Sequence, residues 1–323
     1  MKQNCLNVAY SFDDGYAQHA GVSILSLLEN NKDIDDIVIY IITHSLSDEN
    51  ITRIENIIKI YNREVQYLDL NTITSRMGTN TQFHKSAYGR IFLDCLTNID
   101  RIIYIDSDTV ITGSLKELIS IDITNCLVAG VQDTVNPYYI LNIGLNLNHR
   151  YINDGGVIVL NLELWRKKEI TNKCIDFIRK FNGNPPHNDQ GTINAVCKGC
   201  IKILPACYNV MPPHFKFTRE QIVSLFKMNT YYSQNELDEA VKNPIVIHYT
   251  DEFFNRPWFR NCTHPFKEVY LRYLSMTPWK DCDIQFKELT RNCKIQNWVH
   301  KNCPFFVYKS MIRLIELKHK IKK

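Results

Sequence analysis

Apolar residues in the first half of the chain form short runs that alternate with segments of helical periodicity. Runs of strand length, rich in β-branched and aromatic residues, occupy residues 6–12, 36–43, 64–70 and 101–105. Between them, apolar residues recur at helical spacing over residues 20–30, 47–61 and 86–96, and Ser47 is placed as an N-cap. Strands that alternate with helices predict an α/β fold with a mostly parallel sheet, in which ligands bind beyond the carboxyl ends of the strands.

The second half of the chain follows the same alternation less regularly. A strand is predicted within residues 154–166, helices over 169–181 and 188–198, and a further strand over 243–249. The residues after about 250 are aromatic, basic and helical in pattern, and no repeat or low-complexity linker sets them apart. We therefore predict an α/β domain over residues 1–260 and a helical, basic extension over residues 261–323.

The composition is that of an ordinary globular protein. Of the 323 residues, 45% are hydrophobic and 22% charged, and the net charge of +4 does not favour a nucleic-acid partner. No apolar run approaches the roughly 20 residues of a membrane span, and the N-terminal residues lack the apolar core of a secretory signal. Eleven scattered cysteines suit free thiols in a reducing compartment, so we expect a cytoplasmic protein. The less favoured alternative is a zinc site at Cys197, Cys200 and Cys207, which lacks a fourth ligand at finger-like spacing.

The clearest candidate for chemistry is a pair of aspartates directly after an apolar strand, in the stretch "RIIYIDSDTVI". Asp106 and Asp108 stand two residues apart, so in extended backbone their side chains point to the same side. Two converging carboxylates repel one another unless a cation lies between them, and Mg²⁺ or Mn²⁺ suits oxygen ligands. The pairs Asp33/Asp35 and Asp281/Asp283 follow no such strand and are typical of solvated loops.

Six segments resemble, in order, motifs of the retaining glycosyltransferase family 8, which includes bacterial lipopolysaccharide galactosyl- and glucosyltransferases and the glycogenins. The segments are "VAYSFDDGYAQHAGVSILSLL", "SAYGRIFL", "YIDSDTVITGSL", "INDGGVIVLNLELWR", "NDQGTIN" and "VIHYTDEFFNRPW", which together span roughly residues 7 to 260. The resemblance implies the Rossmann-like nucleotide-sugar fold called GT-A, a UDP-hexose donor, and Mn²⁺, with Mg²⁺ as the alternative ion.

The resemblance also implies a role for individual residues. Asp106, Asp108 and His248 would hold the metal on the diphosphate. Ser11, Asp13 and Tyr16 would contact the nucleoside end of the donor, and Arg256 the diphosphate. Arg90, Asn153, Asp154, Gly155, Asp189 and Gln190 would surround the donor sugar. The alternatives are a Tyr16 that only packs at a helix start and an Arg90 that lies on a helix surface.

The reaction expected from this resemblance retains the anomeric configuration of the sugar. A double displacement needs a nucleophile on the β-face, and the amide of Gln190 is a poor one. A front-side reaction asks less of the protein, because the leaving phosphate helps to deprotonate the acceptor hydroxyl. Asp189 or Gln190 would then stabilise the oxocarbenium-like sugar.

Four departures from the family pattern affect the predicted site. Asp154 stands where the family usually has alanine, and a carboxylate there could hydrogen-bond a sugar hydroxyl. In the last motif Asp251 replaces glycine, Arg256 replaces lysine, and two extra residues separate His248 from "RPW". Arg256 can still pair with phosphate. The rival interpretations are therefore a glycogenin-like self-glucosylating enzyme and a non-catalytic module that binds a nucleotide sugar or glycan.

The C-terminal segment "FFVYKSMIRLIELKHKIKK" reads as a basic amphipathic helix. Its positive residues are Lys309, Arg313, Lys318, Lys320, Lys322 and Lys323, opposed only by Glu316. Met311, Leu314 and Ile315 form an apolar stripe, with Phe305 and Phe306 upstream. Such a helix suits the surface of an anionic membrane, where the acceptor would be a glycan or lipid-linked saccharide, and predicts a peripheral protein at the inner face. The alternative is a terminal helix packed on the domain. No nucleic-acid-binding module is recognisable.

Overall fold

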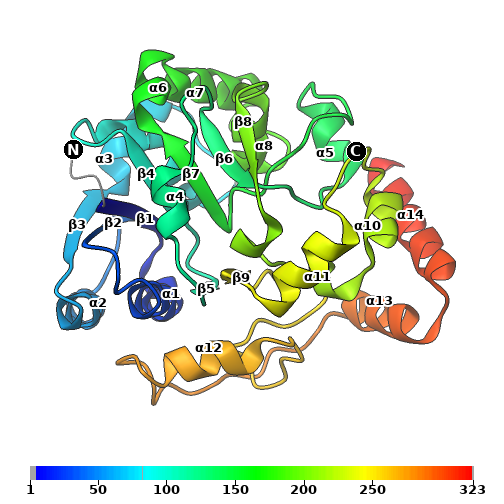
Figure 1. The fold of residues 1–323 in the computed structure, drawn as a ribbon. Coiled ribbons are helices and arrows are strands. Elements are labelled where there is room, and N and C mark those ends of the chain that lie inside the picture. Colours follow the sequence, from blue (N-terminus) through cyan, green and yellow to red (C-terminus); the bar gives the residue numbers. More distant parts are fainter. Residues whose placement is uncertain (1–4, 82, 322–323) are drawn as a thin grey trace.

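A computed structural model describes residues 5–81 and 83–321, and its centre is a seven-stranded sheet (Figure 1). The strand order is β3-β2-β1-β4-β7-β6-β8. The strands are β1 (Cys5–Ser11), β2 (Asp36–Thr43), β3 (Glu64–Asp69), β4 (Arg101–Ile105), β6 (Val128–Val131), β7 (Val157–Asn161) and β8 (Ile201–Leu204). Only β7 runs antiparallel to its neighbours, β4 and β6. The predicted α/β fold with a mostly parallel sheet is confirmed.

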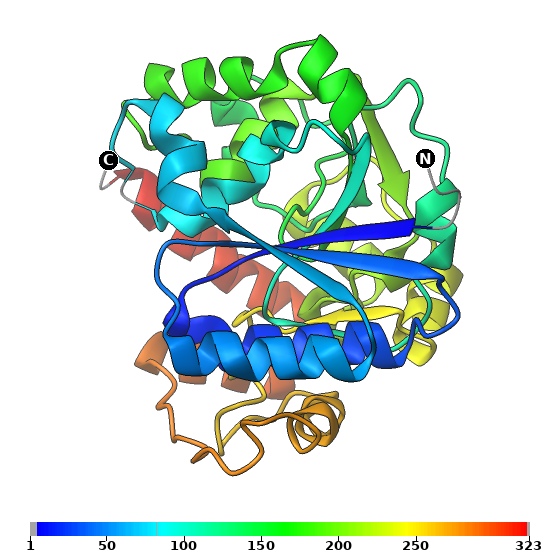
Figure 2. The same ribbon diagram turned by 90° about the vertical axis from the view of Figure 1, so that its left-hand side faces the viewer.

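Alternate residues of the central strands pack on opposite faces of this sheet. In β4, Ile103 and Ile105 belong to one hydrophobic cluster and Ile102 and Tyr104 to the other. This two-sided burial explains why the strands read as continuous apolar runs in the sequence. Figure 2 shows α1 (Ala17–Glu29) and α2 (Asp48–Ile60) on one side, and α6 (Leu162–Lys167) with α7 (Ile170–Lys180) on the other.

Two predicted elements differ from those observed. The strand predicted within 154–166 ends at Asn161, because the Asn161 side chain accepts a hydrogen bond from the Leu164 backbone N–H and starts α6. The helix predicted over 86–96 is a 3₁₀ helix, η3 (Lys85–Cys95). It lies tightly against β1, since a Cβ on Gly89 would come within 2.9 Å of Ser11 Oγ. Ser47 caps α2 as predicted.

A second, two-stranded sheet lies beside the carboxyl end of β4. It pairs β5 (Thr109–Ile111) antiparallel with β9 (Val246–His248) and sets Thr109 opposite His248. Residues far apart in the chain therefore meet just after the Asp106/Asp108 pair. The remaining short elements are η1 (Asp14–Tyr16), α3 (Leu70–Thr74), η2 (Ser75–Met77), α4 (Lys116–Ser120), α5 (Pro137–Asn142), α8 (Asn188–Val196) and η4 (Ala206–Tyr208).

The C-terminal part of the chain is helical and wraps around the open side of the second sheet (Figure 1). It contains α9 (Pro212–Lys216), α10 (Arg219–Phe226), α11 (Gln234–Lys242), α12 (Lys267–Leu274), α13 (Arg291–Asn302) and α14 (Phe305–Ile321). Phe305, Met311 and Ile312 pack against the main hydrophobic core, and Tyr308 is buried in it. Among the described residues, no helix combines the length and apolarity needed to cross a membrane. The division of the chain at residue 260 stays a prediction.

Candidate functional site

All thirteen residues predicted for the site line one cavity of about 660 Å³. It opens where the carboxyl ends of β1 and β4 meet the loops before β7, α8 and η3. A second cavity of about 760 Å³ lies at the opposite end of these strands, around Cys5 and Arg101, and none of the predicted residues lines it. The topology thus gathers six separate sequence segments at one edge of the sheet.

Asp106, Asp108 and His248 form a cluster that could hold a metal ion. One ligand atom from each lies within 4.8 Å of the other two, and His248 Nε2 stands 3.3 Å from Asp108 Oδ1. Two carboxylates and an imidazole suit Mn²⁺, and the carboxylates also suit Mg²⁺. Among the residues that the structure describes, no comparable group forms around Cys197, Cys200 and Cys207, so the zinc alternative finds no support.

The two carboxylates of this cluster differ in their surroundings. Burial raises the pKa of Asp106 to about 6; Arg90 opposes that effect and the neighbouring Asp108 adds to it. For Asp108 burial also raises the pKa, but His248 and Arg256 outweigh it and bring the pKa to about 2. Burial lowers the pKa of His248, yet the adjacent Asp108 carboxylate raises it overall. The cluster is thus a set of acidic groups that a cation would stabilise.

Each metal-facing carboxylate has one oxygen engaged by an arginine. Arg90 Nη2 donates to Asp106 Oδ1 at 2.8 Å, and Arg256 Nη2 lies 3.1 Å from Asp108 Oδ2. The other oxygen of each carboxylate faces a different neighbour: Asp108 Oδ1 faces His248, and Asp106 Oδ2 faces Gly155. A Cβ on Gly155 would come within 2.8 Å of Asp106 Oδ2, so a larger residue here would displace this carboxylate from its present position.

His248 is oriented by Asn209, a residue that no motif in the sequence singles out. The backbone N–H groups of Gly155 and Gly156 donate to Asn153 Oδ1, and Asn209 Nδ2 donates to the same oxygen at 3.0 Å. Asn209 Oδ1 therefore faces His248 Nδ1, at 3.1 Å. In the neutral imidazole this acceptor favours a proton on Nδ1, which leaves the Nε2 lone pair on the side of Asp108, where a metal would bind. Asn153 acts here as the organiser of the turn.

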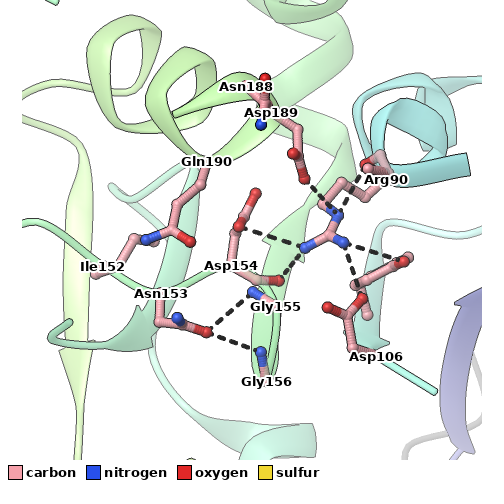
Figure 3. A network of polar contacts seen from close by, with 12 residues as sticks. Arg90, Asp106, Ile152, Asn153, Asp154, Gly155, Gly156, Asn188, Asp189 and Gln190 are labelled. Carbon is pink, nitrogen blue, oxygen red and sulfur yellow. Dashed lines mark hydrogen bonds and ion pairs between the residues drawn. The ribbon is translucent and has the colours of Figure 1, made fainter. Parts of the chain in front are cut away.

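Arg90 lies at the centre of a buried polar network (Figure 3). Its side chain is 4% exposed, which rules out the alternative of a surface arginine. Nε lies 3.3 Å from Asp189 Oδ2, and Nη1 lies 3.4 Å from Asp154 Oδ1 and donates to the Asp154 carbonyl. One guanidinium thus faces three carboxylates. The tight fold of η3 and the bond from Ser11 Oγ to the Ser86 carbonyl hold this arginine in place.

Asp154 is enclosed beside the cavity. Its side chain is buried, and Oδ2 is shielded from solvent. Burial raises the pKa of Asp154 well above its usual range, and the charge of Asp189 and a hydrogen bond to it add to this shift. The neutral form of Asp154 is therefore favoured beside the Asp189 carboxylate.

The remaining predicted residues line the cavity on either side of Arg90. Tyr16 is 39% exposed, and its hydroxyl is bonded by Arg256 Nη1, so its ring is open to the cavity. Asp13, at the start of η1, is half-buried. Gln190 Nε2 donates to Asp133 Oδ2 at 2.5 Å, which adds Asp133 to the site. Asp133 follows the apolar run of β6, the same signal that selected Asp106, but it stands alone.

The fold and the site define a nucleotide-sugar-dependent glycosyltransferase of the GT-A type. The sequence model of glycosyl transferase family 8 matches residues 7–262, and the chain belongs to that family. It is 32% identical over 267 residues to a putative glycosyltransferase of Haemophilus influenzae, covering 80% of this chain and 74% of that one. It is 27% identical to a lipopolysaccharide 1,2-glucosyltransferase of Escherichia coli K12, covering 91% and 86%. The solved structure of the galactosyltransferase LgtC matches its fold with a TM-score of 0.69 at 18% identity, over 90% and 99% of the two chains.

Proposed function

We propose that this chain is a retaining hexosyltransferase that moves galactose or glucose from UDP to a hydroxyl of a saccharide acceptor. The observation that carries this proposal is the Asp106/Asp108/His248 cluster, which opens into the same cavity as the buried Arg90 network. Asp13 and Tyr16 would hold the nucleoside, and Arg256 the diphosphate. A bound Mn²⁺ or Mg²⁺ would supply the positive charge that the diphosphate needs as the sugar–oxygen bond breaks.

The sugar half of the cavity favours a front-side reaction. The bond from the anomeric carbon to the phosphate oxygen breaks, the bond to the acceptor oxygen forms on the same face, and the acceptor proton passes to the leaving phosphate. Asp189 is buried against Arg90, which partly neutralises its charge, and the oxygen of the Gln190 amide is a weak nucleophile, so neither favours a double displacement. Both can stabilise positive charge on the sugar, and Asp154 lines the cavity beside them.

The altered phosphate loop is compatible with catalysis. Asp251 is exposed on the cavity wall, and its charge raises the pKa of Arg256, so the arginine offsets part of the repulsion that Asp251 would exert on a diphosphate. Arg256 points to the metal cluster from the same loop, with its guanidinium over the rings of Tyr16 and Trp258. A cation therefore stands where the family pattern has lysine, which supports turnover over the non-catalytic alternative.

The acceptor is proposed to be a glycan or lipid-linked saccharide at the cytoplasmic face of a membrane. The predicted apolar stripe is not fully available to a membrane, because Met311, and Phe305 upstream of it, pack against the hydrophobic core. The exposed apolar side chains are Ile295, Trp298, Phe306 and Leu314, which we call the outer surface of α13 and α14. Lys294, Lys301 and Arg313 are exposed on the same helices. Lys322 and Lys323 lie outside the described residues, as do the side chains of Ile315, Glu316, Lys318 and Lys320.

Release of UDP from a panel of UDP-hexoses tests the proposed function. We expect one hexose donor to be hydrolysed in the presence of Mn²⁺ and none after chelation, with faster release when a saccharide acceptor is added. Asp108→Asn is the control and should lose metal-dependent release. Growth of the protein's own mass would favour the self-glucosylating alternative. UDP binding without release from any donor, with or without acceptor, would favour the non-catalytic one.

A further inference from the structure

One wall of the cavity is a loop that is longer than the family pattern. Thr250, Asp251, Glu252 and Arg256 all line the cavity, and the two extra residues of the last motif fall among them. The loop carries Arg256, whose Nη2 lies 3.1 Å from Asp108. Whatever fixes residues 250–256 therefore also fixes the cation beside the metal cluster.

The loop is tethered by Asn297, a residue of α13 beyond the family match that ends at residue 262. Asn297 Nδ2 donates to the Phe253 carbonyl at 3.1 Å. Asn297 Oδ1 accepts from Lys216 Nζ, also at 3.1 Å, and that ammonium lies 4.3 Å from the centre of the Phe253 ring. One side chain thus binds the loop backbone and the cation that holds the loop's aromatic ring.

The tethered residue adopts a backbone conformation that needs such support. Phe253 has a φ of +64°, in the left-handed region that bulky residues rarely occupy. Backbone of this kind persists only where surrounding contacts over-determine it. The Phe217 ring supplies one contact, at 5.5 Å from the Phe253 ring, and itself packs on His300 and Phe305 of α13 and α14.

A second bond ties the same loop to the C-terminal segment. Asn255 is 5% exposed, and its Nδ2 donates to the Lys287 carbonyl at 2.9 Å. Residues 287 and 297 thus hold the loop at two points, one on each side of Phe254. The extra length of the loop and the extra helices beyond the family match belong to one structural unit.

We propose that Asn297 is a positioning residue of the donor site: by tethering Phe253 it keeps Arg256 beside Asp108, where it can meet the donor diphosphate. The proposal rests on the proposed function, because it assumes that UDP binds at the metal cluster. It also gives the C-terminal helices a role in donor binding, separate from any contact with a membrane.

Two substitutions at residue 297 separate positioning from simple stability. Asn297→Ala removes both hydrogen bonds. Asn297→Asp removes the donor to Phe253 but keeps an acceptor for Lys216, which is still mostly charged at neutral pH because burial lowers its pKa only to about 8. Asn302→Ala is the matched control: it lies on the same helix, and its side chain bonds only to the Trp298 carbonyl. All variants are made in the full chain.

The measurements are the affinity for UDP in saturating Mn²⁺, the affinity for Mn²⁺ alone, the melting temperature, and hydrogen exchange of the loop amides. We expect both Asn297 variants to bind UDP about five- to tenfold more weakly, the loss that one hydrogen bond predicts. Loop amides should exchange faster in both. Mn²⁺ affinity should not fall, since the metal ligands lie outside the loop and a displaced Arg256 removes a competing positive charge from Asp108. Asn297→Asp should melt near the wild-type temperature, and Asn302→Ala should match the wild type throughout.

Two results would overturn the proposal. Wild-type UDP affinity in both Asn297 variants would do so, and so would a loss confined to Asn297→Ala that follows its melting temperature. A wild-type protein that binds Mn²⁺ but not UDP would instead refute the proposed function. Faster loop exchange in Asn297→Asp would then show that the tether exists without a donor-binding role.

Discussion

Arg90 sets the charge balance of the candidate site at the scale of single residues. One buried guanidinium faces Asp106, Asp154 and Asp189, so the network around it carries an excess of negative charge. Burial raises the pKa of Asp154 and of Asp106, and the neighbouring carboxylates raise both pKa values further. Such a network favours the arrival of a cation, because a metal ion stabilises the ionised carboxylates that burial disfavours.

Mn²⁺ affinity should therefore depend on pH. Burial raises the pKa of Asp106 to about 6, and Asp108 raises that of His248 despite burial, so below pH 6 the ion must displace protons from its ligands. We expect the dissociation constant to be flat above the pKa values of both groups and to rise as the pH falls through them, about tenfold per unit for each group that must lose a proton. Titrations of Mn²⁺ followed by electron paramagnetic resonance between pH 5 and 8 measure this. Equal affinity across that range would contradict it.

Asn209 should prove important for metal binding although it contacts the proposed ligand His248 and would not contact the metal itself. Asn209→Leu keeps the volume but leaves the His248 Nδ1–H without its acceptor. Loss of such an outer contact typically costs about 10- to 100-fold in metal affinity. Asn209→Asp, which keeps an acceptor oxygen, should lose less. Calorimetric titration of Mn²⁺ decides this, and equal affinity in the leucine variant and the wild type would refute the role of Asn209.

Asp154 should influence the choice of donor sugar. Asp154 lines the cavity beside Arg90, and galactose and glucose differ in the direction of one hydroxyl. Because burial favours the neutral carboxyl group, one hydrogen bond of a neutral group is at stake, about 0.5–1.5 kcal/mol, so Asp154→Ala should change the ratio of kcat/KM for the two UDP-hexoses about two- to tenfold. Asp154→Asn is the control of equal size. An unchanged ratio in the alanine variant would leave Asp154 without this role.

At the scale of elements, the site depends on how η3 is fixed to the helices behind it. Thr171 of α7 donates to the Ile91 carbonyl in η3 at 2.9 Å and accepts from Trp165 Nε1 at 3.0 Å. All three residues are buried. This contact joins α6, α7 and the 3₁₀ helix that carries Arg90, so the position of the arginine is set by packing far from the cavity.

Thr171→Val should lower the free energy of unfolding. It keeps the shape of the side chain but leaves a buried indole N–H and a buried carbonyl without partners, at a cost of about 1–3 kcal/mol. Thr52→Val is the matched control, because the Thr52 hydroxyl is exposed and bonds only to the Asp48 carbonyl in its own helix. Urea unfolding of both variants gives the comparison. An equal decrease in the free energy of unfolding in both variants would show that the buried hydrogen bonds of Thr171 do not stabilise the protein more than an exposed one.

The same elements show what sequence could and could not predict. Apolar runs located β1, β2 and β4, because strands buried on both faces need apolar residues throughout. The Asp106/Asp108 pair was selected by its place after such a run. The role of Asn209 could not be predicted, because it depends on contacts between distant segments of the chain. The end of β7 at Asn161 depends on a side-chain cap. Hydrophobic periodicity reports neither feature. The 3₁₀ winding of η3 likewise depends on its approach to β1.

At the scale of the whole molecule, the C-terminal helices pack on the core with one face and expose apolar side chains on the other. Their inner side packs on the core through Phe305, Tyr308 and Met311, and α13 tethers the loop that carries Arg256. Their outer surface exposes Trp298 and Phe306, at 62% and 69%. Deleting these helices would therefore disturb the core and the cavity together, so a test of membrane binding needs point substitutions.

Phe306→Ala should weaken binding to vesicles that contain anionic lipid. Withdrawing one phenylalanine side chain from an apolar environment costs about 1.5–3 kcal/mol, which predicts roughly a tenfold or greater loss of partitioning. Phe286→Ala is the matched control, since Phe286 is 64% exposed but lies outside α13 and α14. Cosedimentation with vesicles measures the partitioning of both variants. Higher salt should weaken the binding, because Lys294, Lys301 and Arg313 would contribute electrostatically. UDP affinity should stay unchanged in both variants. Equal losses in Phe306→Ala and Phe286→Ala would assign the binding to general hydrophobicity, and wild-type binding by Phe306→Ala would remove the outer surface of α13 and α14 from the membrane altogether.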